Sequence, residues 1–240
     1  MGLNTTYTAR SAADAARSLK HAGRWDLALE LPGAETAALR AELLTDRFFW
    51  RLDDPTEAEA AVTVLSQKDP ALGGFYDAQL AYTRLLFDLD PRSDDEGRAR
   101  TGFFRATKDQ RLMGWATFWT GIVTENFDDA LGHAREHYTR ALDSALENGD
   151  LLLESYAIRH LGAMALADGD PAGLDDLRRS YQLRAALGAR PQTAAAAATY
   201  AAALPPAAEA EQLTGLAART ARELGLTWLN QALQVRSAHQ

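Results

Sequence analysis

A short phrase recurs along the chain, in which a turn is followed by an acidic residue and then by a new apolar helical face. It reads GRWDLAL at residues 23–29, NFDDAL at 126–131 and GDPAGL at 169–174, with a weaker copy, LDDP, at 52–55. Turns that return between helices are typical of stacked helical arrays, in which each unit buries its apolar face against its neighbours. The phrase therefore predicts a helical array, and it leaves open what the array binds.

Helical periodicity dominates the rest of the chain. Apolar residues recur at steps of three and four within residues 75–89, 112–122, 130–145 and 153–164, which gives each segment one apolar stripe. Sustained alternation of β-branched residues is absent, and no Asn-Gly or Asp-Gly pair separates two strand-like runs. We therefore expect an all-α fold, namely an α-solenoid of about six antiparallel helix pairs.

The breaks between the apolar segments carry helix-capping residues. Asp54, Asp69 and Asp170 each precede a proline, which places an acidic cap before the first helical position. Gly149, which follows Asn148, is predicted to end a helix by adopting the left-handed backbone conformation. The predicted helices cover residues 7–20, 24–31, 34–52, 55–67, 71–89, 95–107, 109–125, 127–148, 151–168, 171–187, 191–203, 206–224 and 227–237.

Three segments differ in regularity. In residues 127–240, helix ends near Gly149, Gly188 and Gly225 recur every 37 to 39 residues, which is a two-helix period. Residues 91–126 are predicted to form central aromatic-rich helices and residues 1–90 N-terminal helical repeats. We expect all three segments to form one continuous array. The acidic stretch at 88–96 is the best internal boundary, because its charges favour solvent and Pro91 interrupts helix.

The C-terminal segment resembles tetratricopeptide-repeat (TPR) proteins. Leu161-Gly162 matches the Leu-Gly pair of the first repeat helix, where glycine lets the partner helix come close, and Gly169-Asp170 matches the turn. Residues 145–150 look like the joint between repeats in TPR-like arrays of large actinobacterial regulators. Arg178 departs from the pattern, because the family usually has a large apolar residue there. Over residues 127–237 the resemblance implies a superhelix whose groove, lined mainly by the first helix of each pair, binds a protein or peptide.

Composition narrows the classes of function. The net charge of −8 and the pI near 5.2 argue against nucleic-acid binding through broad phosphate neutralisation. The chain has no cysteine, which removes disulfides and zinc-thiolate sites. A secretory signal and an apolar run long enough to span a membrane are both absent from the sequence, so we expect a cytoplasmic protein without a membrane partner. Arginine greatly outnumbers lysine among many alanines, which is typical of bacterial sequences of high GC content.

The most enzyme-like string is His133-Ala134-Arg135-Glu136-His137. It fits the H-x-x-E-H pattern of inverted zinc peptidases, in which two histidines one helical turn apart hold zinc and the glutamate activates water. Glu209 and His160 are conceivable third ligands. Three fixed positions occur often by chance, and the strands of those larger α/β enzymes are missing from the pattern. We therefore expect no enzyme activity, no metal and no cofactor, with a metal-dependent hydrolase as the weakest alternative.

A second candidate site is an aromatic cluster with interleaved basic residues between Phe103 and Trp119. Trp115 and Trp119 share one helix face, and Arg111 is close in sequence. Aromatic faces beside guanidinium groups can hold a planar or anionic ligand. The alternative is a packed core where two parts of the array meet, with the basic groups solvating its outside.

We expect the chain to act as a non-catalytic interaction scaffold with a protein or peptide partner. A regulatory module that responds to a small-molecule ligand and acts through a partner is the alternative, and a homodimer is also compatible with such a surface. Arg184 is a further polar residue that we expect near the surface that binds the partner. The candidate binding residues are Trp115, Trp119, Arg111, His133, His137, Arg140, Arg159 and His160.

Overall fold

The computed structural model describes residues 2–128 and 130–237, with side chains over residues 12–128 and 130–235. This part of the chain holds thirteen α-helices and no strand, so the fold is all-α, as the periodicity predicts. The helices are α1 (Gly2–His21), α2 (Trp25–Glu30), α3 (Ala37–Arg51), α4 (Thr56–Lys68), α5 (Pro70–Phe87), α6 (Asp95–Ala106), α7 (Met113–Phe127), α8 (Leu131–Asn148), α9 (Leu151–Ala167), α10 (Gly173–Ala186), α11 (Arg190–Ala203), α12 (Ala208–Leu224) and α13 (Thr227–Ser237).

The capping residues act where the sequence indicates. The Asp69 carboxylate accepts the Leu72 N–H at 3.1 Å at the start of α5. Gly149 ends α8 with φ of 66°, in the left-handed region where glycine has no steric penalty. Because caps and periodicity are local signals, every predicted helix is found, and the ends shift by a few residues.

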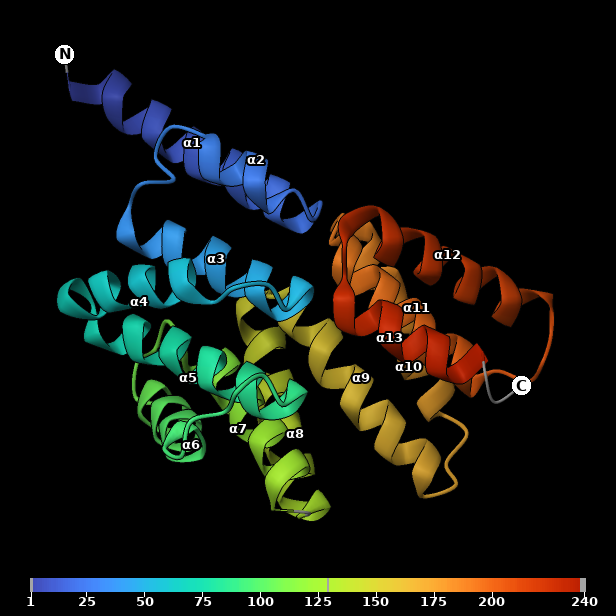
Figure 1. Cartoon of the computed structure of the whole chain (residues 1–240). Coiled ribbons are helices and arrows are strands. Elements are labelled where there is room, and N and C mark those ends of the chain that lie inside the picture. Colours follow the sequence, from blue (N-terminus) through green and yellow to red (C-terminus); the bar gives the residue numbers. More distant parts are fainter. Residues whose placement is uncertain (1, 129, 238–240) are drawn as a thin grey trace.

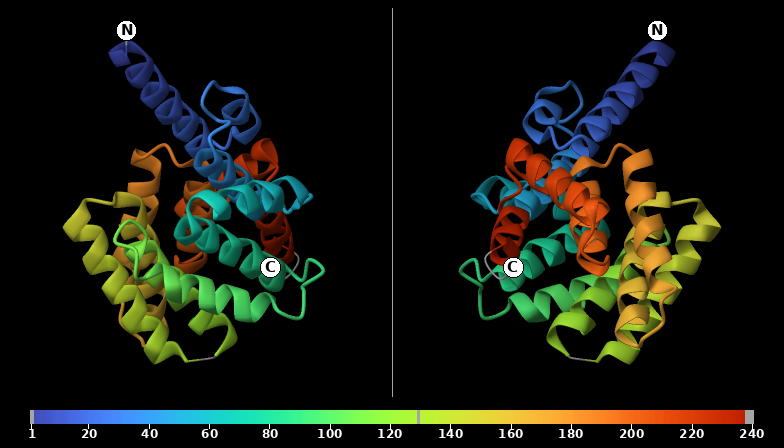
Figure 2. Two further views of the ribbon diagram at one scale, coloured as in Figure 1. Left: turned by 90° about the vertical axis from the view of Figure 1, so that its left-hand side faces the viewer. Right: turned by 90° about the vertical axis from the view of Figure 1, so that its right-hand side faces the viewer.

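Successive helices pack against one another in pairs, and the succession bends back on itself (Figures 1 and 2). The pairs α5–α6, α7–α8, α9–α10 and α11–α12 pack most closely, and each pair also contacts the next. At the end of the chain α13 contacts α3. This contact joins α3 to α13, so the helices from α3 to α13 are arranged in a ring. The residues on the inside of the ring come mainly from α3, α5, α7, α9, α11 and α13.

Aromatic and ionic contacts close the ring. Trp228 of α13 stacks on Trp50 of α3, with ring centroids 5.3 Å apart, and on Phe87 of α5 at 6.1 Å. On the outside, Arg24 Nη2 lies 3.0 Å from Glu223 Oε1, which links the start of α2 to the end of α12. Stacked aromatic pairs contribute about 0.5–1.5 kcal/mol each beyond the area they bury, so the aromatic contacts are the stronger part of the closure.

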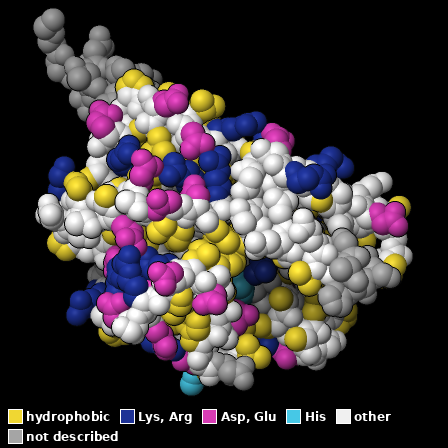
Figure 3. Space-filling model, in the orientation of Figure 1, with side chains coloured by type: hydrophobic (Ala, Val, Ile, Leu, Met, Phe, Trp, Pro, Cys, Tyr) yellow, Lys and Arg dark blue, Asp and Glu magenta, His cyan; other side chains and the backbone are white. Residues whose placement is uncertain are grey.

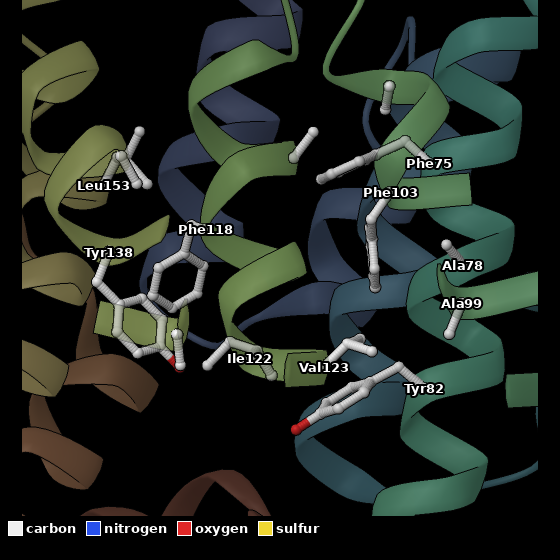
Figure 4. Close-up of a cluster of buried hydrophobic side chains, with 14 of the residues drawn as sticks. Phe75, Ala78, Tyr82, Ala99, Phe103, Phe118, Ile122, Val123, Tyr138 and Leu153 are labelled. Atoms are coloured by element: carbon white, nitrogen blue, oxygen red, sulfur yellow. The ribbon is translucent and has the colours of Figure 1, made fainter. Parts of the chain in front are cut away.

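Two hydrophobic clusters hold most of the core. The first runs from α5 to α9 and includes Phe103, Phe118 and Tyr138. Figure 4 shows Phe118 beside Tyr138 and, further along, Phe103 beside Phe75. The second joins Trp25 and Trp50 to side chains of α10 to α13. Both clusters include residues from more than one of the three segments into which the sequence divides.

Glycine permits the close approach of α9 and α10. A Cβ added to Gly173 would lie 2.2 Å from the Gly162 carbonyl oxygen, and one added to Gly162 would lie 2.8 Å from the Gly173 carbonyl oxygen. Both values are far below van der Waals contact, so neither position has room for a side chain. The close approach that the Leu161-Gly162 pair indicates is therefore present.

The sequence predicts that the acidic stretch at 88–96 is exposed to solvent, and the structure departs from this prediction at one residue. Asp88, Asp90, Asp94 and Glu96 are exposed, whereas the side chain of Asp95 has no exposed surface. Arg84 of α5 holds the Asp95 carboxylate through two hydrogen bonds, of 2.6 and 2.8 Å. The stretch thus connects α5 to α6 and also supplies a buried ion pair that ties them together.

Candidate functional site

A pocket of about 400 Å³ opens inside the ring. Its wall comes mainly from the first helices of the pairs, and from α13. Figure 3 shows a hollow near the centre of the face in view, with hydrophobic atoms around it and basic and histidine atoms inside. The lining residues are Phe49, Trp50, Tyr82, Leu86, Phe87, Phe118, Trp119, Ile122, Glu125, Asn126, Tyr156, Arg159, His160, Arg184, Ala195, Ala198, Thr199, Trp228, Leu229, Ala232 and Leu233.

A chain of polar side chains crosses the otherwise apolar wall. Arg159 Nη1 lies 2.8 Å from His160 Nε2, and His160 Nδ1 lies 3.0 Å from Glu125 Oε2. The Tyr138 hydroxyl donates to the same Glu125 oxygen. A guanidinium can only donate and a carboxylate only accept, so the imidazole must carry its proton on Nδ1 and accept at Nε2.

The pKa of His160 agrees with this tautomer. Burial lowers the pKa of His160 to about 4, and the charge of Arg159 acts in the same direction against the hydrogen bond to Glu125. Burial alone would raise the pKa of Glu125, but its bonds to His160 and Tyr138 hold it below the usual value. At neutral pH a neutral imidazole therefore links an ionised carboxylate to the guanidinium of Arg159.

The low pKa of His160 makes stability depend on pH. Below about pH 6.5, the ordinary histidine pKa, the unfolded chain binds a proton here that the folded chain refuses until about pH 4. Stability is therefore lost as the pH falls, and this residue accounts for about 2–3 kcal/mol between pH 7 and pH 4.5. Urea unfolding of the wild type and of His160→Gln at both pH values measures it. The variant should lose less stability on acidification, and equal losses would contradict the assignment.

Arg184 of α10 reaches the pocket from behind Tyr156. Its side chain is 2% exposed, and its guanidinium carbon lies 4.1 Å from the Tyr156 ring centroid. The guanidinium donates to the Ser155 hydroxyl and carbonyl at 3.1 and 3.3 Å and to the Gln192 carbonyl at 3.3 Å. All of these acceptors are uncharged, so the fold solvates the Arg184 charge without neutralising it.

A second cavity, of about 660 Å³, lies on the other side of an aromatic partition. Four residues line both cavities, namely Phe49, Trp50, Trp119 and Tyr156. The second cavity is also lined by charged groups that have partners within the protein. Lys20 Nζ lies 2.6 Å from Glu42 Oε1, and Trp25 Nε1 donates to Asp46 Oδ2 at 2.6 Å. The two cavities therefore differ in whether their cations have carboxylate partners.

The structure brings together three of the eight candidate binding residues that the sequence indicates. Trp119, Arg159 and His160 line the first pocket. Trp115 lines the second cavity, where its Nε1 donates to Asp150 Oδ2 at 2.9 Å. The two tryptophans lie on one face of α7, as the sequence indicates, and Trp119 stacks on Phe103 at 5.5 Å. The aromatic cluster is thus part of the packed core and of the pocket wall at once.

The other candidate residues lie away from the pocket. Arg111 is exposed between α6 and α7, where it pairs with Asp69 and Asp109. His133 and Arg140 are exposed on α8, which is the second helix of its pair. His137 is half-buried against Gly121 of α7, and its Nδ1 has no hydrogen-bond partner in the described part of the chain.

The H-x-x-E-H string is not joined by a third metal donor. Among the side chains that the structure describes, no group of three His, Cys, Asp or Glu residues could hold a metal ion. The two conceivable third ligands are engaged elsewhere, because Glu209 accepts the Tyr200 hydroxyl at 3.3 Å and His160 binds Glu125. The donor set at His133 and His137 is therefore limited to the string itself.

Sequence reasoning missed two kinds of pocket residue. Glu125 lies one turn after Ile122 on the apolar stripe of α7. An acidic residue on an apolar helix face indicates a buried polar site, so Glu125 could have been identified from the sequence. Trp50 and Trp228 line the pocket where α3 and α13 meet, and no local sequence pattern predicts that these two helices are in contact. Buried polar residues can thus be found along a helix, whereas contacts between distant helices cannot.

Comparisons with protein-family models, with curated proteins and with solved structures give no match to this chain. In the part of the chain that the structure covers, no helix is long and apolar enough to cross a membrane.

Proposed function

We propose that the helix pairs form a TPR-like superhelix that has closed into a ring, and that the ring binds a small ligand in its central pocket. The observation that carries this proposal is the aromatic pocket of about 400 Å³ on the inner faces of the helices. Small-molecule sites are typically concave, largely apolar and 300–1,000 Å³ in volume, with a few polar groups that fix orientation. This pocket has all of these properties.

The closed ring favours a small ligand over an extended peptide. A peptide groove needs an open inner surface, whereas the contact of α13 with α3 encloses the inner surface here. The expectation that a protein or peptide binds in the groove stays a prediction, and with the ring closed we propose the outer faces as the place for such a partner. Because α13 both lines the pocket and closes the ring, it also supports a regulatory role, in which the ligand stabilises α13 and a partner reads its position.

The pocket is tested with an uncharged aromatic probe, N-phenyl-1-naphthylamine, whose fluorescence rises in apolar surroundings. Ala195 of α11 lines the pocket, so Ala195→Phe should fill it and weaken probe binding about tenfold or more. The matched control is Ala202→Phe on the same helix, because Ala202 is exposed outside the pocket. That variant should bind the probe like the wild type.

Circular dichroism confirms in parallel that both variants keep their helices. Absence of saturable binding by the wild type, or equal binding by the two variants, would refute the pocket as the binding site.

A further inference from the structure

The first pocket contains more positive charge than the protein neutralises. Arg159 and Arg184 both line it, and neither has a carboxylate within ion-pair distance among the described side chains. Glu125 is the acidic residue in the wall, and it is occupied by His160 and Tyr138. With His160 neutral, two guanidinium groups face one carboxylate, which leaves a net positive charge.

This arrangement costs stability when the pocket holds no anion. Charges in a confined apolar site are poorly solvated, and two like charges also repel each other. Burial, together with the nearby charge of Arg159, lowers the pKa of Arg184 to about 10, although Tyr156 acts in the opposite direction. Burial likewise lowers the pKa of Arg159, although the charge of Glu125 opposes this effect. A bound anion would offset both the poor solvation and the repulsion.

Arg159 is also held in position. His160 accepts one of its N–H groups, and Glu125 fixes the imidazole that accepts it. A guanidinium has five N–H donors in a planar fork, so most of the donors of Arg159 remain for a ligand. Such a fork matches the two oxygens of an oxyanion and forms charge-assisted hydrogen bonds with them.

The second cavity shows that the pocket is unusual within the same protein. There Lys20 and Arg17 lie 2.6 and 3.2 Å from Glu42, and the nearby carboxylate of Asp46 supplies a second negative charge. Its cations are neutralised by the protein itself, so a ligand anion would gain little there. The unneutralised charge is specific to the Arg159 side of the aromatic partition.

Resting on the proposed function, we propose that the ligand of the first pocket is an organic oxyanion with a planar apolar body. The oxyanion binds the guanidinium of Arg159, with the charge of Arg184 behind it. The planar body lies among the aromatic rings of the wall, where Trp119, Tyr156 and Trp228 offer apolar surface.

The test compares two probes that share one aromatic body. 8-Anilinonaphthalene-1-sulfonate carries a sulfonate, and N-phenyl-1-naphthylamine lacks it. In fluorescence titrations of the whole chain at pH 7, the sulfonate should bind the wild type about tenfold or more tightly than the uncharged probe, as expected for charge-assisted hydrogen bonds. Ala195→Phe should weaken both probes, which places both in the pocket.

Variants of Arg159 then separate charge from shape. Arg159→Gln should abolish most of the preference for the sulfonate while the uncharged probe keeps its affinity, which also shows that the pocket is intact. Arg159→Lys should restore part of the preference, because an ammonium supplies the charge without the planar fork. Arg140→Gln is the control, since Arg140 is exposed on α8 away from the pocket.

The outcomes distinguish the two proposals. If neither probe binds the wild type in a way that Ala195→Phe blocks, the proposed function fails. If both probes bind the pocket with equal affinity, or if Arg159→Gln keeps the preference for the sulfonate, the pocket remains a ligand site and the oxyanion proposal is overturned.

Discussion

Replacing Asp95 by alanine is expected to lower the free energy of unfolding by about 3–5 kcal/mol, because it leaves a buried guanidinium without its main counter-charge. The Asp95 carboxylate is fully buried and accepts two hydrogen bonds from Arg84, one from the Arg92 N–H at 2.8 Å and one from Arg98 at 3.2 Å. Arg84 is 3% exposed and keeps only Glu59, at 2.8 Å, when Asp95 is lost. Urea unfolding followed by circular dichroism measures the change.

The neighbouring acid supplies the control. Asp94 is exposed and caps α6 without a side-chain hydrogen bond, so Asp94→Ala should change stability by less than about 0.5 kcal/mol. A double variant, Arg84→Met with Asp95→Leu, should recover much of the loss, since apolar residues of similar volume can replace a buried ion pair. Equal effects of Asp94→Ala and Asp95→Ala would show that the pair contributes little.

Asp95 also makes the protein sensitive to strong acid. Burial acts to raise the pKa of Asp95, but the hydrogen bonds from Arg84 and Arg92 hold it below the usual value. The stabilisation is therefore complete above about pH 4, the ordinary aspartate pKa, and is lost as the pH falls below it. This range lies below the one in which His160 acts.

Gly173→Ala is the second substitution with a large expected effect. The added methyl would lie 2.2 Å from the Gly162 carbonyl oxygen and 3.0 Å from the Leu166 backbone nitrogen, so relief requires α9 and α10 to move apart. Overpacking a well-packed contact costs about 1–3 kcal/mol, and a backbone contact places this case at the upper end. Thermal unfolding should show a correspondingly lower melting temperature.

A glycine with free space around it should respond in the opposite direction. Gly97 in the first turn of α6 has no atom within 4 Å of the position of an added Cβ. Gly97→Ala should therefore stabilise by up to about 1 kcal/mol, because alanine has the higher helix propensity. If both substitutions had the same sign, the close approach of α9 and α10 would not be the cause of the loss.

The sequence predicts the helices of this protein well because their signals are local. Asp69 caps its helix and Gly149 ends one through contacts within a few residues, so each can be recognised without the rest of the chain. The same applies to Gly162, whose place in a Leu-Gly pair indicates a close helix contact. Such features depend only on the spacing of neighbouring residues.

The pocket could be predicted only in part, because it depends on contacts between distant residues. Trp119, Arg159 and His160 lie on the inner helices and could be singled out as unusual side chains on their stripes. Nothing in the sequence shows that α7 and α9 face inward while α8, with His133, lies outside. That choice is made by the closure of the ring, in which Trp228 stacks on a tryptophan near the start of the chain.

The contacts of α2 and α3 with α12 and α13 have a consequence for synthesis of the protein on the ribosome. In an open repeat array each pair can fold as soon as its neighbour has emerged, because all contacts are local. Here Arg24 and Glu223, which are 199 positions apart, meet at the ring closure. Contacts at such separation form slowly, because they carry a large loop-closure cost. The nascent chain would therefore hold the helix pairs from α3 to α12 before it has a binding site, because the site is complete only when α13 has been made.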